Sequence, residues 1–198
     1  MNQHARRPAT MMKMFGKTYT RQQVAEAVHQ GVRQYTGSDG RSHCRLYALG
    51  GFMLLGHMGI EAHIQCGSLN VQPDPDDPTL WITMDPASGI LGEFHCWLAS
   101  PDRQLMPGGN FVSSGSIIDF STRHLSRYVE DGGAGTWRRE QPPSYIWDDF
   151  SEVPKWYEVR SQEEPCRKVG SSITEQEMRG LGRPMLLALK SGACNPRR

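Results

Sequence analysis

The sequence predicts an α+β fold in which helices pack on an antiparallel sheet. Apolar residues recur at helical spacing over residues 21–35, and residues 46–55 are apolar nearly all round. After Gly59 the apolar residues alternate with polar ones, a pattern typical of strands that have two different faces. The strand-like segments are short and separated by turns, which favours antiparallel pairing.

Length and composition favour a single domain. The chain has 198 residues, of which 37% are apolar and 22% are charged, and this is enough for one packed core. We expect residues 20–130 to form the core and residues 131–198 to form an extension packed on it. Residues 1–19 are expected to be a flexible segment.

Charge and hydropathy exclude several kinds of partner. The net charge is +1 and the basic residues are scattered, so a nucleic-acid partner is not expected. A membrane partner is not expected either, because no run of about 20 apolar residues occurs and residues 1–19 do not resemble a signal peptide. The five cysteines are an odd number, which favours reduced thiols in a cytoplasmic protein. The sequence does not indicate the oligomeric state.

The first helix is predicted over residues 21–35. Thr20 and Gln23 have the spacing of a capping box, and Gly37 to Gly40 end the helix. The apolar positions that recur at helical spacing are Val24, Ala27, Val28, Val32 and Tyr35.

A second helix is predicted to lie in the centre of the fold. Ser42 can cap it, and its interior from Leu46 to Leu55 is apolar on every side. This start places Cys44 in the first turn of the helix.

Four strands follow, and a further helix ends the chain. His95 and Trp97 share one face of their strand, as Ile117 and Asp119 do of theirs. The loops Pro73–Pro78 and Pro107–Ser116 are expected to rim a cleft. The predicted strands are 62–66, 80–84, 94–99 and 116–120. A short helical segment is expected at 122–129, and the last helix is expected to begin at a capping box formed by Thr174 and Glu177. Pro184 is expected to interrupt or restart this last helix.

Cys44 is the candidate nucleophile. A thiol has an ordinary pKa of about 8.5, and a helix N-terminus lowers that pKa because its backbone N–H groups favour the thiolate. A histidine facing Cys44 would take the thiol proton, and a carboxylate behind the histidine would orient its ring. His95 and Asp119 are the candidates for these two roles.

The residues around these three positions resemble one enzyme family. The resemblance rests on Ser42–Leu49, Leu54–Leu55, Gly59–Ala62, Phe94–Trp97 and Ile117–Ser121. Together they are similar to the transglutaminase-like branch of the papain-like cysteine enzymes, which includes peptidases, transglutaminases, arylamine N-acetyltransferases and many uncharacterised bacterial proteins. The resemblance implies a central helix that carries the cysteine, packed on an antiparallel sheet that carries the histidine and the aspartate.

The expected activity is thiol catalysis on an amide or related acyl group. Cys44 would attack the carbonyl, His95 would act as base and then as acid, and Asp119 would orient His95. Water as acceptor would give a peptidase, amidase or deamidase, and an amine would give a transferase. Hydrolysis is favoured because water needs no second binding site. The expected partner is a peptide, a protein or a small amide, and no cofactor is required.

The oxyanion donors are less well defined by the sequence. The backbone N–H of Cys44 is one candidate, and Gln34 is another, although it falls on the first predicted helix.

Each candidate also has a structural interpretation. His95 is compatible with an ordinary hydrogen-bonded histidine on a strand, and Asp119 with a cap for the helix at 122–129. Trp147, Trp156 and Tyr157 are expected to anchor the extension on the core. A partner-binding module with a blocked triad remains an alternative.

Zinc binding is a further alternative. Thiolate and imidazole ligands suit zinc, and they occur together at His43–Cys44, at His63 with Cys66, and at His95–Cys96. Neighbours on a strand point to opposite faces, however, and no C-x-x-C motif is present, so zinc is the weaker hypothesis.

Overall fold

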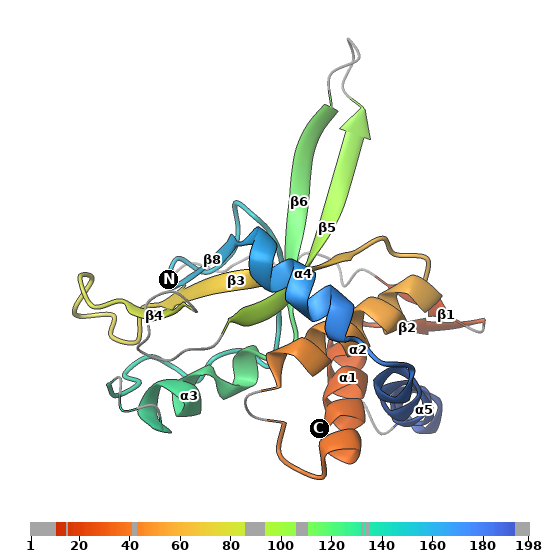
Figure 1. Cartoon of the computed structure of the whole chain (residues 1–198). Coiled ribbons are helices and arrows are strands. Elements are labelled where there is room, and N and C mark those ends of the chain that lie inside the picture. Colours follow the sequence, from red (N-terminus) through yellow and green to blue (C-terminus); the bar gives the residue numbers. More distant parts are fainter. Residues whose placement is uncertain are drawn as a thin grey trace.

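The fold was obtained as a computed structural model, which describes residues 11–14, 16–40, 43–85, 94–105, 111–131, 133 and 135–192, with backbone alone at 101–105 and 111–114. It is a mixed α+β structure with five α-helices and an antiparallel sheet, as the sequence predicted (Figure 1). None of the helices among these residues is long and apolar enough to cross a bilayer.

Three helices form a layer beside the sheet. They are α1 (Arg21–Thr36), α2 (Cys44–His57) and α5 (Glu175–Ser191), and they gather at the lower right of Figure 1. The predicted capping box at Thr20 is present, with the Thr20 hydroxyl accepting from the Gln23 N–H and the Gln23 side chain accepting from the Thr20 N–H. Ser42, the predicted cap of α2, lies outside the described residues, and His43 stands at that position.

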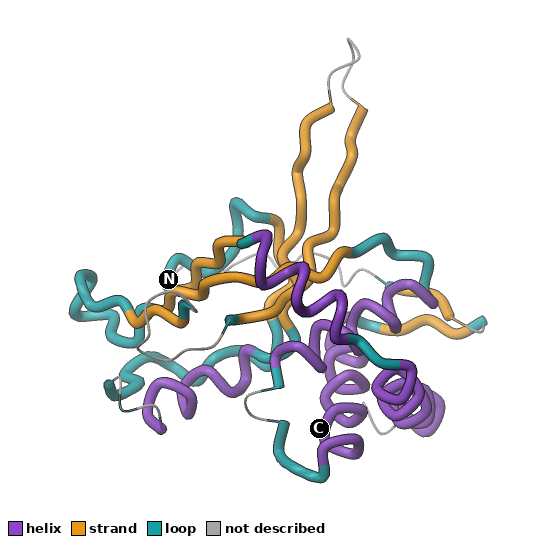
Figure 2. The backbone as a smooth tube through the Cα atoms, in the orientation of Figure 1, coloured by secondary structure: helices purple, strands orange, loops and turns teal. Residues whose placement is uncertain are grey.

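The main sheet has six strands, all paired antiparallel. Its order is β4-β3-β5-β6-β7, and β8 also pairs with β3. The strands are β3 (His63–Val71), β4 (Ile82–Met84), β5 (His95–Leu105), β6 (Phe111–Asp119), β7 (Ile146–Asp149) and β8 (Tyr157–Ser161). Strands β5 and β6 continue beyond the rest of the sheet as a two-stranded arm (Figure 2).

Two expectations about loops are corrected. Much of the loop expected at 107–116 is strand, because β6 begins at Phe111 and pairs with β5 from Leu105 back to Leu98. Part of the segment expected to be flexible is also ordered, since β1 (Met12–Met14) and β2 (Lys17–Tyr19) form a hairpin. Burial of Met12, Met14 and Tyr19 against the core holds that hairpin in place.

Both faces of the sheet are covered by apolar side chains. Cys66, Cys96, Leu98 and Ile118 face the helices α1, α2 and α5. On the opposite face Trp97, Ile117 and Ile146 pack with α3 (Leu125–Asp131) and with the irregular segment that contains Trp137. The alternation along β5 therefore sends His95 and Trp97 to one face and Cys96 and Leu98 to the other.

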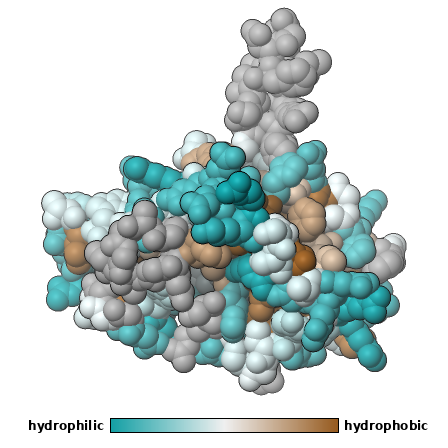
Figure 3. Space-filling view, in the orientation of Figure 1, coloured by the Kyte–Doolittle hydropathy of each residue, from teal (hydrophilic) through white to brown (hydrophobic). Residues whose placement is uncertain are grey.

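The C-terminal third adds elements to the sheet and to the helical layer. Strands β7 and β8 pair with β6 and β3, and α4 (Glu163–Ser172) packs on β3. The outer side of α4 is hydrophilic in Figure 3 and carries an exposed ion pair between Glu164 and Lys168. Local periodicity did not predict α4.

The last helix differs from the prediction at Pro184. The capping box of Thr174 and Glu177 is present, but α5 runs through Pro184 without a break. Its buried face explains this continuity, because Leu181 and Met185 pack closely against α1. At the crossing a Cβ on Gly31 would lie 2.4 Å from Met185 Cγ, so only glycine fits this approach.

Candidate active site

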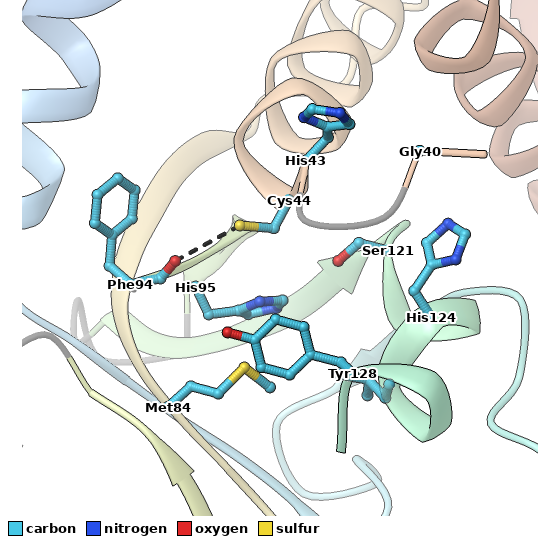
Figure 4. A pocket seen from close by; sticks show the side chains of 10 residues that line it. Gly40, His43, Cys44, Met84, Phe94, His95, Ser121, His124 and Tyr128 are labelled. Carbon is cyan, nitrogen blue, oxygen red and sulfur yellow. Dashed lines mark hydrogen bonds between the residues drawn. The ribbon is translucent and has the colours of Figure 1, made fainter. Parts of the chain in front are cut away.

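Two of the three predicted site residues border one pocket at the N-terminal end of α2. It lies between this helix, the start of β5 and the turn that leads into α3 (Figure 4). Cys44 and His95 both line it, and most of the other lining side chains are apolar or aromatic. The remaining lining residues are Gly40, His43, Met84, Phe94, Ser121, His124, Leu125 and Tyr128.

Cys44 is the first residue of α2 and is half-buried. Its Sγ lies 3.6 Å from the Phe94 carbonyl oxygen, the last backbone group before β5 begins (Figure 4). This contact joins the start of the helix to the start of the strand that carries His95. The candidate nucleophile Cys44 and the candidate base His95 therefore lie at the same pocket, although 51 positions separate them in the chain.

The surroundings hold the pKa of Cys44 well below its ordinary value. A hydrogen bond from the Cys96 thiol has the largest effect, while burial acts in the opposite direction. A hydrogen bond and the positive charge of His95 lower the pKa of Cys44 further. The surroundings of Cys44 therefore favour its thiolate form.

His95 and Asp119 are in direct contact and both are buried. The distance between His95 Nε2 and Asp119 Oδ2 is 2.7 Å. Burial opposes the charge on His95, but the negative charge and the hydrogen bond of Asp119 outweigh it and raise the pKa of His95 to about 10. Because Asp119 occupies Nε2, Nδ1 is the ring nitrogen left to exchange a proton with Cys44.

Asp119 accepts four hydrogen bonds. Its Oδ1 accepts from the Ser121 backbone N–H at 2.8 Å and from the Ser121 hydroxyl at 2.7 Å, and its Oδ2 accepts from the Tyr157 hydroxyl at 2.7 Å as well as from His95. Burial opposes ionisation, yet the charge of His95 and these donors hold the pKa of Asp119 below its ordinary value. One oxygen thus closes a local turn with Ser121, while the other faces His95; the cap position of the helix that follows is Ser121, which corrects the capping role considered for Asp119.

Tyr157 is a site residue that the sequence did not reveal. We expected it to anchor the extension, and it is indeed buried, but its hydroxyl donates to Asp119. Burial and the neighbouring carboxylate raise its pKa well above the ordinary value, so the hydroxyl keeps its proton. No local pattern could have identified it, because pairing of β8 with β3 brings it to the site from 38 residues away.

A second polar chain runs inward from the pocket wall. The Tyr47 hydroxyl lies 2.9 Å from His124 Nε2 and 2.6 Å from His29 Nδ1. Burial, together with the charge of Arg123, lowers the pKa of His29 to about 4, so this ring is neutral. Since the hydroxyl has one proton, one ring must accept from it and the other must donate to it. Gly40, at φ +87°, leaves room for this hydroxyl, which a Cβ would approach to 2.5 Å.

Gln34 does not reach the pocket, which corrects its candidacy as an oxyanion donor. It is exposed on α1 and borders a separate depression together with Arg33 and Asp39. The helical phase of α1 explains this, since Val28 and Val32 occupy its buried side.

The His and Cys pairs considered for zinc are not arranged as a metal site. The His63 side chain is 57% exposed and its Nε2 lies 3.3 Å from Glu61. Among the described residues no group of three or more His, Cys, Asp or Glu side chains is arranged to hold a metal ion.

The site therefore brings Cys44, His95 and Asp119 together and adds Tyr157 and Ser121 behind the carboxylate. Comparison of this chain with the descriptions of known families, with curated proteins and with solved structures finds no match.

Proposed function

We propose that this protein is a thiol-dependent enzyme that acts on an amide or related acyl group. Cys44 is the nucleophile, His95 the base and acid, and Asp119 the residue that orients His95. The observation that carries the proposal is the 2.7 Å contact of His95 with Asp119, at a ring that also lines the pocket of Cys44.

The charges of the site suit the first step of this reaction. The Cys44 thiolate beside a protonated His95 attacks the carbonyl carbon, and negative charge moves to the carbonyl oxygen. The backbone N–H of Cys44, at the start of α2, is the candidate donor to that oxygen. His95 then gives its proton to the leaving amine, which breaks the amide bond and leaves a thioester on Cys44.

The second step determines the class of enzyme. Water attacks the thioester with His95 as base, so that a peptidase, amidase or deamidase reaction results. We favour hydrolysis because water needs no binding site of its own. With an amine as acceptor, the same triad would act as a transferase. The apolar wall of Met84, Leu125 and Tyr128 favours an apolar or aromatic acyl group, in a peptide, a protein or a small amide.

The arrangement also supports a papain-like, transglutaminase-like core. The cysteine begins a helix that packs on β5, and the histidine and aspartate come from two neighbouring antiparallel strands. We place the enzyme in the cytoplasm, where its cysteines would stay reduced.

Selective alkylation tests the thiol chemistry. Iodoacetamide at pH 6.5 should label Cys44 at least about tenfold faster than Cys166, because both are half-buried and the surroundings hold the pKa of Cys44 well below its ordinary value. Mass spectrometry of digested protein measures each site, and His95→Gln should remove the difference. Equal labelling of Cys44 and Cys166 would overturn the proposal.

Acyl transfer to Cys44 tests the reaction itself. A panel of p-nitrophenyl esters with acetyl, hexanoyl and phenylacetyl groups should give a burst of p-nitrophenol and an acyl adduct on Cys44 that intact-mass spectrometry detects. Cys44→Ser should abolish the burst. Adding an amine distinguishes the two classes, since a transferase would convert the adduct into an amide.

A further inference from the structure

Four cysteines extend in a row from the pocket into the core. Cys44 borders the pocket and packs against the buried cluster that contains Cys96 and Cys66. The Sγ atoms of Cys96 and Cys66 are 3.0 Å apart. Cys166 follows, with its Sγ 3.0 Å from the Cys66 backbone nitrogen. The acyl chemistry proposed above uses only the first of these thiols.

The backbone places Cys66 and Cys96 where a disulfide fits. They lie directly opposite each other on β3 and β5. The N–H of Cys66 points to Cys166 and its carbonyl accepts from the Gln162 N–H, so both groups face away from β5. Such a pair has Cα atoms about 4.5 Å apart, within the span of roughly 4.4 to 6.8 Å that disulfides bridge. No movement of the strands is needed.

Access to this pair runs through Cys44. Cys66 and Cys96 are 0% and 1% exposed, whereas Cys44 is half-buried and borders the pocket. A small oxidant that enters the pocket therefore meets Cys44 first. Cys166 is half-buried at the other end of the row and contacts the backbone of Cys66.

We propose that Cys66 and Cys96 form a redox-active dithiol that a peroxide oxidises by way of Cys44. The inference goes beyond the proposed acyl chemistry, because it needs a reactive thiol at Cys44 but neither an acyl substrate nor an oxyanion site.

The reaction balances in three steps. The Cys44 thiolate attacks one oxygen of hydrogen peroxide, the O–O bond breaks, and the other oxygen leaves as hydroxide, giving a sulfenic acid on Cys44. The Cys96 sulfur attacks the sulfenic sulfur, the S–O bond breaks, and water leaves with the Cys96 proton. The Cys66 sulfur then attacks Cys96, the bond between Cys44 and Cys96 breaks, and the Cys66 proton passes to solvent, where it neutralises the hydroxide released in the first step. Two thiols lose two electrons, and the peroxide becomes water.

The acidity of the thiols favours the last step. Exchange is fastest when the leaving thiol has a low pKa. The pKa of Cys44 is well below its ordinary value, whereas donation of the Cys96 proton to Cys44 and Cys66, together with burial, raises the pKa of Cys96. Cys44 is therefore the better leaving group, and the disulfide moves to the buried pair. The nucleophile is returned as a thiolate before a second peroxide can oxidise it to the sulfinic acid.

Mapping of thiols after peroxide treatment tests this route. The reduced protein receives a small excess of hydrogen peroxide, is quenched with N-ethylmaleimide in denaturant, digested and analysed by mass spectrometry. We expect a peptide linked through Cys66 and Cys96, with Cys44 recovered as an alkylated thiol. Cys66→Ser should instead trap the disulfide between Cys44 and Cys96, or leave Cys44 as the sulfinic acid.

Two matched changes test the entry point. Cys44→Ala should slow formation of the linked peptide at least about tenfold, while Cys166→Ala should leave it at the wild-type rate. Prior alkylation of Cys44 in the folded wild type should have the effect of Cys44→Ala without a substitution. The proposal is overturned if Cys66 and Cys96 remain thiols while Cys44 is overoxidised, or if blocked Cys44 leaves the rate unchanged. A burst with p-nitrophenyl esters is independent of either result, so the two proposals can fail separately.

Discussion

At the scale of single residues, the site depends on charges that compensate one another in a buried place. His95 and Asp119 would each be costly to bury as isolated ions. Their contact, with Ser121 and Tyr157 as further donors, makes the charged pair stable there. Cys44 is then held as a thiolate next to the charge of His95.

Replacing Asp119 by Asn should therefore reduce the reactivity of Cys44. The pKa of His95 would fall without the carboxylate charge, and a neutral imidazole would no longer stabilise the thiolate. At pH 6 we expect alkylation of Cys44 to slow by roughly tenfold or more. Asp77→Asn, on an exposed loop, is the matched control and should leave the rate unchanged. Identical rates in Asp119→Asn and wild type would contradict this role.

Replacing Tyr157 by Phe removes one donor from Asp119 and keeps the ring. A buried acceptor that loses a partner costs about 1 to 3 kcal/mol of unfolding free energy, which urea denaturation would measure. We also expect the pH profile of Cys44 alkylation to shift, which a purely structural loss would not produce. Tyr145→Phe, at a half-buried tyrosine outside the pocket, is the control. An unchanged profile would leave Tyr157 with a packing role only.

At the scale of elements, the crossing of α1 and α5 fixes the helical layer beside the sheet. Gly31 lets Met185 approach the backbone of α1, and Met185 is buried there. The sequence predicted both helices from their capping boxes, since a cap is a local signal. The break that it predicted at Pro184 does not occur, because no local pattern reveals the tertiary packing of Leu181 and Met185.

Gly31→Ala should destabilise the protein by about 1 to 3 kcal/mol, because the added Cβ would overlap Met185 and force it to move. Gly170→Ala on α4 is the matched control. No atom lies within 4 Å of the added Cβ there, so the helix should gain up to about 1 kcal/mol. Thermal and urea unfolding of both variants measure this difference, and equal effects would contradict close packing at Gly31.

At the scale of the whole molecule, folding and acidity are coupled through Cys44. Its pKa is lower in the folded state than the value of about 8.5 in an unfolded chain. A lowered pKa contributes stability that is fully present above the unfolded value and is lost as the pH falls through the folded one. The tertiary structure thus favours the thiolate, and the thiolate favours the folded state.

The unfolding free energy of the wild type, minus that of Cys44→Ala, should therefore increase as the pH rises from 6 to about 8.5 and then level off. Urea denaturation of both proteins at pH 6, 7, 8 and 9 measures this difference, and taking the difference removes the contribution of other titrating groups. A difference that stays constant with pH would contradict a depressed pKa at Cys44.

How much of the molecule could be predicted depends on the range of each signal. Helices α1 and α2 and the strands around His95 and Asp119 follow from local periodicity, and they place the three candidate residues correctly on their elements. Strand β8 and its Tyr157 could not be assigned to the site, because only pairing across the chain brings them there. The arm of β5 and β6 was also missed, since its Ser- and Gly-rich strand has no apolar alternation.

The bond from Tyr157 to Asp119 has a consequence for synthesis on the ribosome. Cys44, His95 and Asp119 all emerge before Tyr157, and β8 must pair with β3 before that bond can form. A nascent chain that ends short of β8 therefore lacks one of the four hydrogen-bond donors to Asp119. The order of translation therefore places the completion of the hydrogen bonds on Asp119 late in synthesis.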